Sequence, residues 1–473
     1  MIERAKRSFK ELVIRRLQRE DAQARRNLPA QFNGLPPSLW GYDVTADGVL
    51  GLEGLRVPEL ISRYGTPLYV VSAAWLRKTY EDFIRPFREH YPDTRLATSY
   101  KTNPVPAVVS TLHECGTDAE VISEFEMWLA GRVGLPGERI IVNGPGKSRA
   151  MLERAVSMGV KVINIDGFEE IEAISAAARR LGRVQPVGVR VTTSVGWSSQ
   201  FGLPLATGDA FAAFERIKRT PGLEAMGVHL HLGTGLKSVD LYLRAITEVL
   251  EFGALLRERL GIELRCYDLG GGYGVPTVRG KDVWDDRMLS LGYPAREPLP
   301  AACPSPADYA ARIAALFKER TPPDRRPQIV LEPGRAITSS AQTLLLSVIA
   351  TKDTYGVRRL ILDGGKNITL PLGWETHKIF PVQRLNDPAV RSTCLYGPLC
   401  HPGDVVASHL PLPEMGVGDA IAIMDAGAYF VPNQMNFSNP RPAIVMVEGG
   451  KIRVVRQRES FEDVVRLDGI TAD

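Results

Sequence analysis

Eight short β-rich runs, most of them separated by helical patterns, constrain the fold of this chain more than any other feature. They lie at residues 96–100, 119–122, 140–143, 162–165, 187–191, 227–231, 266–269 and 329–332. Strands that alternate with helices form parallel sheets. Eight such units over about 240 residues match a closed (β/α)8, TIM-like barrel. An open doubly wound sheet is the alternative that this pattern also allows.

The pattern changes after residue 338, where strands follow one another without helices between them. They lie at residues 359–365, 403–410, 418–427, 442–450 and 451–457. This spacing predicts an antiparallel β domain at the C-terminal end of an otherwise α/β chain. The segment 35–72 contains YDVTADGVLGLEG, which is typical of strand-turn-strand, and we expect it to join the same domain.

We therefore predict four parts. Residues 1–34 form a helical extension, 35–72 join the β domain, 73–338 form the barrel, and 339–473 form the C-terminal β domain. The segment 273–305 lacks a strong pattern, and we expect a long loop on the barrel, a feature that is often functional.

Composition excludes several function classes. The net charge is +4 over 473 residues, and the Lys and Arg residues are scattered, so no nucleic-acid surface is expected. No apolar run reaches about 18 residues, so no membrane span is expected. The five cysteines are odd in number and form no C-x-x-C pair, which indicates a reducing, cytoplasmic location. The N-terminal stretch is charged and lacks a signal-peptide core; a surface or partner-bound helix is favoured over a membrane-surface helix.

Reactive or flexible residues follow four of the predicted barrel strands. They are Lys101, His231, the glycines 270–272, Glu332 and Arg335. In a (β/α)8 barrel the carboxyl ends of the strands share one face, so these groups should converge. Singly, each has an ordinary explanation: a solvated lysine, a core histidine, a glycine turn or a surface ion pair.

Together these groups answer the needs of one cofactor, pyridoxal 5′-phosphate. A lysine in a dry pocket can lose its proton and form an imine with an aldehyde. Glycines let backbone N–H groups approach a phosphate, and an arginine can clamp it. A carboxylate beside the ring nitrogen keeps that nitrogen protonated. No metal site is expected.

Seven motifs occur in one order between about residues 60 and 465: SYKTNPVPAVV, EVISEFE, HLHLGTG, YDLGGGYG, LEPGRA, LYGPLCHPGD and MDAGAY. In these motifs the chain resembles the fold type III pyridoxal-phosphate decarboxylases, which include diaminopimelate, ornithine and biosynthetic arginine decarboxylases. The resemblance implies that Lys101 is the Schiff-base lysine, that His231 stacks on the cofactor, and that Glu332 pairs with its ring nitrogen.

The resemblance also implies a homodimer with shared active sites. Cys400 would come from the second subunit and return a proton to the substrate carbon after carbon dioxide leaves. The remaining residues implied to hold the cofactor are Glu120 and Arg190 near the ring, Thr234, Gly271, Gly272, Gly334 and Arg335 at the phosphate, and Tyr429 of the second subunit.

The chain departs from this family where the substrate side chain is recognised. The acidic residue expected after Cys400 is His401, and no arginine precedes Pro371. A buried ammonium needs a paired anion, which is missing here. We expect Lys366 and His401, with Asp404, to contact the substrate and to favour an anionic or conjugated side chain.

The sequence therefore predicts decarboxylation of an amino acid or an amino-acid conjugate, free or carrier-tethered, in a specialised siderophore- or antibiotic-type pathway. Meso-diaminopimelate decarboxylation in lysine biosynthesis is the first alternative. A racemase on the same barrel is another, although Cys400 argues against it. A catalytically dead binding relative is the last.

Overall fold

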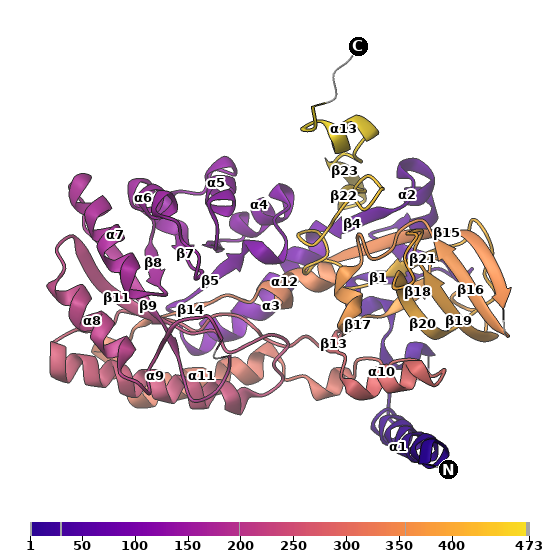
Figure 1. Ribbon diagram of the computed structural model, residues 1–473, viewed down its shortest axis with the longest axis horizontal. Coiled ribbons are helices and arrows are strands. Elements are labelled where there is room, and N and C mark those ends of the chain that lie inside the picture. Colours follow the sequence, from indigo (N-terminus) through magenta and orange to yellow (C-terminus); the bar gives the residue numbers. More distant parts are fainter. Residues whose placement is uncertain (1, 29–30, 198, 355, 470–473) are drawn as a thin grey trace. The chain divides into compact units, whose positions relative to one another are not determined.

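The computed structural model describes residues 2–28, 31–197, 199–354 and 356–469, which divide into two compact units (Figure 1). The barrel unit comprises residues 77–274 and 304–337. The β unit comprises the described parts of residues 1–76, 275–303 and 338–473. Met1, residues 29–30 and residues 470–473, which the predicted extension and C-terminal domain included, lie outside the described residues.

Eight parallel strands form the closed barrel. In spatial order they run β9, β11, β12, β14, β5, β6, β7 and β8, and pairing of β8 with β9 closes the ring. This closure confirms the predicted barrel and excludes the open sheet. The strand bounds are β5 Thr94–Ser99, β6 Asp118–Val121, β7 Ile140–Val142, β8 Val162–Ile165, β9 Gln185–Thr192, β11 Leu223–His229, β12 Cys266–Asp268 and β14 Gln328–Leu331; the short β10 Leu203–Pro204 pairs with β9.

Helices surround these strands (Figure 1). Their ends follow local capping chemistry: the Ser148 hydroxyl accepts the Met151 N–H at 3.0 Å, and Ser305 forms a capping box with Asp308. Their bounds are α3 Ala73–His90, α4 Pro106–Glu114, α5 Glu124–Arg132, α6 Arg149–Met158, α7 Phe168–Arg180, α8 Asp209–Arg219, α9 Val239–Leu260, α11 Pro306–Arg320 and α12 Gly334–Thr338.

The β unit is built on a mostly antiparallel sheet, as predicted. Its order is β20-β19-β16-β15-β4-β22-β23, and β21 adds β18 alongside β15. Two neighbouring pairs, β16–β19 and β4–β22, are parallel. The bounds are β4 Leu68–Ser72, β15 Gln342–Thr354, β16 Val357–Leu362, β18 Ile379–Pro381, β19 Arg391–Tyr396, β20 Val405–Leu412, β21 Ala420–Ile423, β22 Ala443–Glu448 and β23 Lys451–Arg456; the helix α13 Phe461–Val465 follows.

The N-terminal segment joins this unit, as the predicted fold class requires. Strands β1 Tyr42–Val44 and β2 Leu50–Leu52 form the expected antiparallel pair, followed by β3 Leu55–Arg56 and α2 Val57–Tyr64. Trp40, Leu50 and Leu68 share one buried core with Phe380 and Val445, so burial of apolar surface ties the segment to the sheet. The preceding helix α1 spans Ile2–Ala24. Within the described residues, none of the helices has the length and apolar character needed to cross a membrane.

The segment 275–303 corrects one expectation. We expected a loop on the barrel, but Val275–Cys303 belongs to the β unit and contains β13 Arg279–Gly280 and α10 Val283–Ser290. Strand β13 pairs antiparallel with β17 Glu375–Thr376, and this pairing attaches the segment to the β unit.

Candidate active site

Lys101 lies in the mouth of the barrel beside Glu120. It follows β5 in the turn Tyr100–Thr102, while Glu120 lies on the neighbouring strand β6. The Lys101 Nζ lies 3.3 Å and 3.2 Å from the two carboxylate oxygens of Glu120. The Glu120 side chain is 1% exposed and that of Lys101 is 34% exposed. The half-buried amine is therefore held at the end of its strand by a fully buried carboxylate.

Asn143 connects this pair to Glu332. The Asn143 Nδ2 donates to Glu332 Oε1 at 2.7 Å and to Glu120 Oε1 at 3.1 Å. The side-chain oxygen of Asn143, Oδ1, accepts from Asn164 Nδ2 at 2.8 Å. The sequence analysis missed both asparagines. The signal was present, because Asn143 and Asn164 lie at the carboxyl ends of predicted strands.

Glu332 is the buried carboxylate that stays ionised. Although burial opposes ionisation, His229, Lys101 and His231 together hold the pKa of Glu332 well below its usual range. The His229 Nε2 lies 3.5 Å from Glu332 Oε2. Burial and the charge of Glu332 raise the pKa of Asp268 well above its usual range. Polar atoms of His229, Asp268 and Glu332 lie within 4.8 Å of one another, a spacing that also suits a metal ion.

His231 is a neutral ring at the same mouth. It lies two residues beyond the end of β11, which stops at His229 and not at His231 as predicted. Burial, with the Lys101 charge adding to it, lowers the pKa of His231 to about 3. Its Nδ1 accepts the Gly271 N–H at 3.2 Å, so the ring proton lies on Nε2. An uncharged ring that is fixed in this way can lie against a flat cofactor.

Glycine is required at residues 270–272 because the backbone of neighbouring segments comes too close to leave room for a side chain. A Cβ on Gly271 would lie 2.2 Å from the Glu332 carbonyl oxygen, and one on Gly272 would lie 2.1 Å from the Gly233 carbonyl oxygen. The turn thereby packs against the 233–235 turn that carries Thr234. In the same way, a Cβ on Gly334 would lie 2.3 Å from the Thr102 hydroxyl. Arg335 follows and is 8% exposed.

A cavity of about 140 Å³ joins these groups. Lys101, Glu120, His231 and Glu332 line it, together with Arg190, Trp197 and Phe201. The Arg190 guanidinium carbon lies 4.2 Å from the centre of the Phe201 ring. The Trp197 and His231 ring centres are 6.0 Å apart. The sequence analysis named Arg190 but missed the two aromatic residues.

This donor set fits pyridoxal phosphate. A primary amine, a buried ionised carboxylate and a neutral imidazole line one cavity, and the 270–272 glycine turn contacts it through the hydrogen bond from Gly271 to His231. Each group meets a different need of that cofactor. In the group with metal-like spacing, His229 has a role of its own, because it helps to keep Glu332 ionised.

The other predicted site residues lie in the β unit. Asp404 is 2% exposed, and its two oxygens accept the Leu399 N–H at 2.8 Å and the Lys366 N–H at 2.7 Å. Asp404 thus holds two loops together, and its contact with the substrate stays a prediction. Cys400 is exposed next to this bridge. The His401 Nδ1 accepts the Gly403 N–H at 3.0 Å.

Tyr429 has an unusual backbone conformation for a residue with a side chain. Its φ is +66°, and its carbonyl accepts from Asn433 Nδ2 at 2.8 Å. Left-handed backbone at a tyrosine is strained and is found most often where a side chain must be aimed at a functional site.

Known proteins share this architecture over nearly the whole chain. The family model for the pyridoxal-dependent decarboxylase, pyridoxal binding domain, matches residues 77–339. The diaminopimelate decarboxylase of Archaeoglobus fulgidus is 30% identical over 436 residues, which cover 89% of this chain and 97% of that protein. The Bacillus subtilis diaminopimelate decarboxylase is 29% identical over 440 residues, covering 89% and 95%.

A solved structure gives the same match in space. The crystal structure of diaminopimelate decarboxylase from Methanocaldococcus jannaschii superposes with a TM-score of 0.82 at 25% identity, covering 91% of this chain and 98% of that one. A second structure of that enzyme is a complex with L-lysine and has a TM-score of 0.81. With its amine, carboxylate and imidazole at one barrel mouth, the chain belongs to the fold type III pyridoxal-phosphate-dependent decarboxylases, carboxy-lyases that act on amino acids.

Proposed function

We propose that this chain decarboxylates meso-diaminopimelate to lysine. The observation that carries the proposal is the near full-length match to relatives named diaminopimelate decarboxylase, which spans both units. The sequence analysis placed a conjugated amino acid of a specialised pathway first and diaminopimelate second. The relatives favour the second reading.

The barrel unit supplies the groups for the cofactor. Bound pyridoxal phosphate withdraws electrons from the substrate's α-carbon as carbon dioxide leaves. Lys101 Nζ would be the amine that binds the cofactor. The ionised Glu332 would accept a hydrogen bond from the protonated ring nitrogen, with Asn143 and His229 stabilising the Glu332 charge. His231 supports the ring face, and Glu120 and Arg190 flank it.

The phosphate would be held by the turns that the glycines bring together. We assign this role to backbone N–H groups of Gly271, Gly272 and Gly334, to the hydroxyl of Thr234 and to Arg335. Glycine turns and an arginine are suited to phosphate because they present N–H donors without steric hindrance.

Cys400 and Tyr429 would act from the second subunit of a homodimer. Cys400 Sγ would return a proton to the α-carbon, since its exposed position on the Asp404 bridge leaves the thiol free to meet another surface. Tyr429 would reach the phosphate. A cytoplasmic location fits the five free cysteines, because thiols persist in a reducing compartment.

The experiment is a carbon dioxide release assay on purified enzyme with meso-diaminopimelate, with lysine quantified as the product. Borohydride should trap the cofactor on Lys101. The proposal fails if no trapped Lys101 is found or if lysine does not form. The same assay on a panel of N-acylated and carrier-linked amino acids tests the conjugated substrate, which His401 and the missing arginine before Pro371 favour. Solvent deuterium uptake without carbon dioxide release would indicate a racemase.

A further inference from the structure

A second cavity lies wholly within the β unit, beside the Cys400 loop. Its volume is about 350 Å³, which is in the range typical of small-molecule sites. Asp404 accepts the backbone N–H groups of Leu399 and Lys366. Leu399 directly precedes Cys400, so the Cys400 loop is held close to Lys366. Lys366 lines the cavity, and so does Val405, which directly follows Asp404 in sequence.

Not all of the charged side chains that line this cavity are paired with an opposite charge. Lys378 pairs with Glu297 at 2.7 Å, and His377 Nε2 lies 3.1 Å from Glu375 Oε2. Lys281 and Lys366 are the two lysines of the lining that lie outside these pairs. Among the described residues, no carboxylate lies within ion-pair distance of either amine, and the Lys281 Nζ donates only to the Leu372 carbonyl, at 2.5 Å.

Asp286 is the remaining carboxylate in the lining, and it is exposed. Burial lowers the pKa of the Lys281 amine; the charge of Asp286 counteracts this shift and that of Lys366 adds to it. The three charges are therefore near enough to influence one another. Two cations and one anion around a cavity match a ligand end that carries both a carboxylate and an ammonium.

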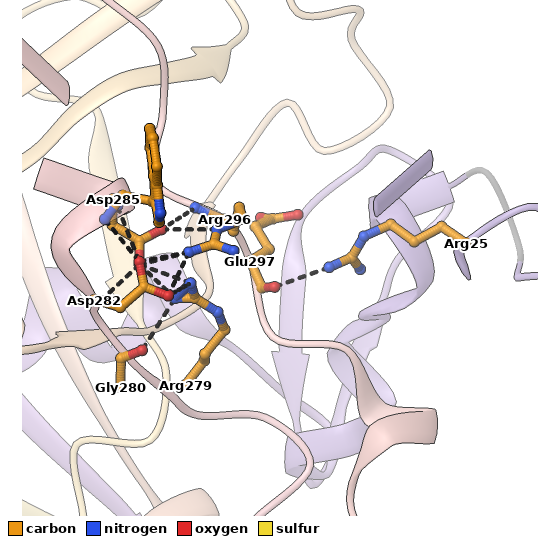
Figure 2. A network of polar contacts seen from close by, with 8 residues as sticks. Arg25, Arg279, Gly280, Asp282, Asp285, Arg296 and Glu297 are labelled. Atoms are coloured by element: carbon orange, nitrogen blue, oxygen red, sulfur yellow. Dashed lines mark hydrogen bonds and ion pairs between the residues drawn. The ribbon is translucent and has the colours of Figure 1, made fainter. Parts of the chain in front are cut away.

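Ion pairs hold the segment that carries Lys281 and Asp286, and Figure 2 shows them around Asp282 and Asp285. The Asp285 carboxylate, which has no exposed surface, accepts from Arg279 at 2.6 Å and from Arg296 Nε at 3.2 Å. Asp282 also accepts from Arg296, at 2.6 Å. Lys281 lies between Arg279 and Asp282 in sequence, and its backbone N–H donates to the Trp374 carbonyl at 2.8 Å. Its position is thus fixed on both sides.

We propose that this cavity binds the far end of the amino-acid substrate, with its carboxylate at Lys281 and Lys366 and its ammonium at Asp286. The inference rests on the proposed function, in which Cys400 acts at the α-carbon. The cavity would supply the anion and the cation that recognise the far end of the substrate. In the resembling decarboxylases an acidic residue and an arginine do this, but here the first position is His401 and no arginine precedes Pro371.

Three ligands that share one terminal amine test the assignment on the holoenzyme. L-lysine carries the far carboxylate and ammonium, 6-aminohexanoate carries only the carboxylate, and cadaverine carries only the ammonium. Their affinities are measured by calorimetry for the wild type and for Lys281→Gln, Lys366→Gln and Asp286→Asn. Lys451→Gln, on the exposed end of β23, is the matched control.

We expect Lys281→Gln and Lys366→Gln each to weaken L-lysine and 6-aminohexanoate by at least about tenfold, because charge-assisted hydrogen bonds are lost, and to leave cadaverine unchanged. Asp286→Asn should weaken L-lysine and cadaverine but not 6-aminohexanoate. Lys281→Arg should restore the carboxylate ligands. Equal affinities in wild type and variants, or equal loss of all three ligands, would overturn the assignment.

Cofactor absorbance and the thermal midpoint of each variant show whether it is folded and loaded. If carbon dioxide release from diaminopimelate fails while the charge-dependent pattern holds, the proposed function is wrong and the cavity assignment stands. If lysine forms but the pattern is absent, only the cavity assignment falls.

Discussion

At the scale of single residues, Asn143 links the two buried carboxylates of the site. One amide nitrogen donates to both Glu332 and Glu120. Asn143→Ala should lower kcat by about 10- to 100-fold, because a hydrogen bond to a charged group contributes about 1.5–3 kcal/mol. Steady-state kinetics with diaminopimelate check this. Asn386→Ala, which removes an exposed amide of the β unit, is the control. An unchanged kcat in Asn143→Ala would contradict the role given to Glu332.

Glu126 gives a prediction about pH. Burial, with the charge of Glu120 adding to it, raises the pKa of Glu126 to about 7. The unfolded chain loses this proton first as the pH rises, near the ordinary value of 4.5. Stability therefore falls between about pH 4.5 and 7, by up to about 1.4 kcal/mol per pH unit.

Glu126→Gln should remove that pH dependence. An amide oxygen can still accept the Ile122 N–H, which Glu126 accepts at 2.8 Å. The variant should gain stability relative to wild type as the pH rises from 5 to 8, measured by urea unfolding at fixed cofactor concentration. Glu124→Gln, exposed on the same helix, provides the baseline. A difference that does not change with pH would refute the assignment.

At the scale of elements, the turn after β12 is fixed by its lack of side chains. Gly271→Ala would place a Cβ against the Glu332 carbonyl, so the strand end that carries Glu332 must move. We expect a loss of about 1–3 kcal/mol in the free energy of unfolding, as in other overpacked sites. Cofactor affinity, measured by absorbance titration, should fall as well.

Gly131→Ala is the control for that turn. Gly131 lies in helix α5, and a Cβ there would meet only the Met158 methyl at 3.9 Å. Alanine should raise stability by up to about 1 kcal/mol, because it has the higher helix propensity. Equal effects of the two substitutions would show that the close approach at Gly271 does not matter.

The segment 275–303 should open locally when its buried carboxylate loses its charge. Asp285→Asn leaves Arg279 and Arg296 without their shared anion, and breaking a buried pair costs about 3–5 kcal/mol. Hydrogen exchange of residues 279–297 should accelerate, while that of the barrel strands stays unchanged. Asp286→Asn, at the next and exposed position, should leave exchange as in wild type. If both variants exchange alike, the network of Figure 2 does not hold the segment.

At the scale of the whole molecule, shared active sites predict complementation between two inactive variants. Lys101→Ala lacks the proposed cofactor amine, and Cys400→Ala lacks the proposed proton donor. If each site takes Lys101 from one subunit and Cys400 from the other, a mixed dimer has one intact site. Subunit exchange should then restore about a quarter of wild-type activity. Carbon dioxide release from an equimolar mixture measures it, and a mixture that stays inactive after exchange would exclude shared sites.

Sequence periodicity was sufficient for the barrel because each strand and helix carries its own local pattern. All eight barrel strands and the positions of Lys101 and Glu332 at strand ends followed from it. In the C-terminal domain, strands β15, β17, β18 and β19 were missed. The β15 strand lies centrally, between β16 and β4, and its first five residues, Gln342 to Leu346, are all buried and mix polar with apolar side chains, so they do not alternate as a half-exposed strand does.

Contacts between distant parts of the chain account for what else the sequence did not predict. Asp404 accepts from backbone donors at residues 366 and 399, and spacing alone does not show which groups a carboxylate will meet. The placement of segment 275–303 depends on β13 finding β17, which lies 95 residues later, as Gly280 to Glu375. Asn143 is different, because its position at a strand end was visible in the sequence.

Glu297 joins two regions that are far apart in the sequence. Its backbone carbonyl accepts from Arg25 at 2.8 Å, and its side chain accepts from Asn33 at 2.7 Å and from Lys378 at 2.7 Å. The first 34 residues and the 275–303 segment are thus structurally interdependent. Evolution should gain or lose the two together, so homologues that begin directly at the β-domain segment should also have a short connection between barrel strand β12 and helix α11.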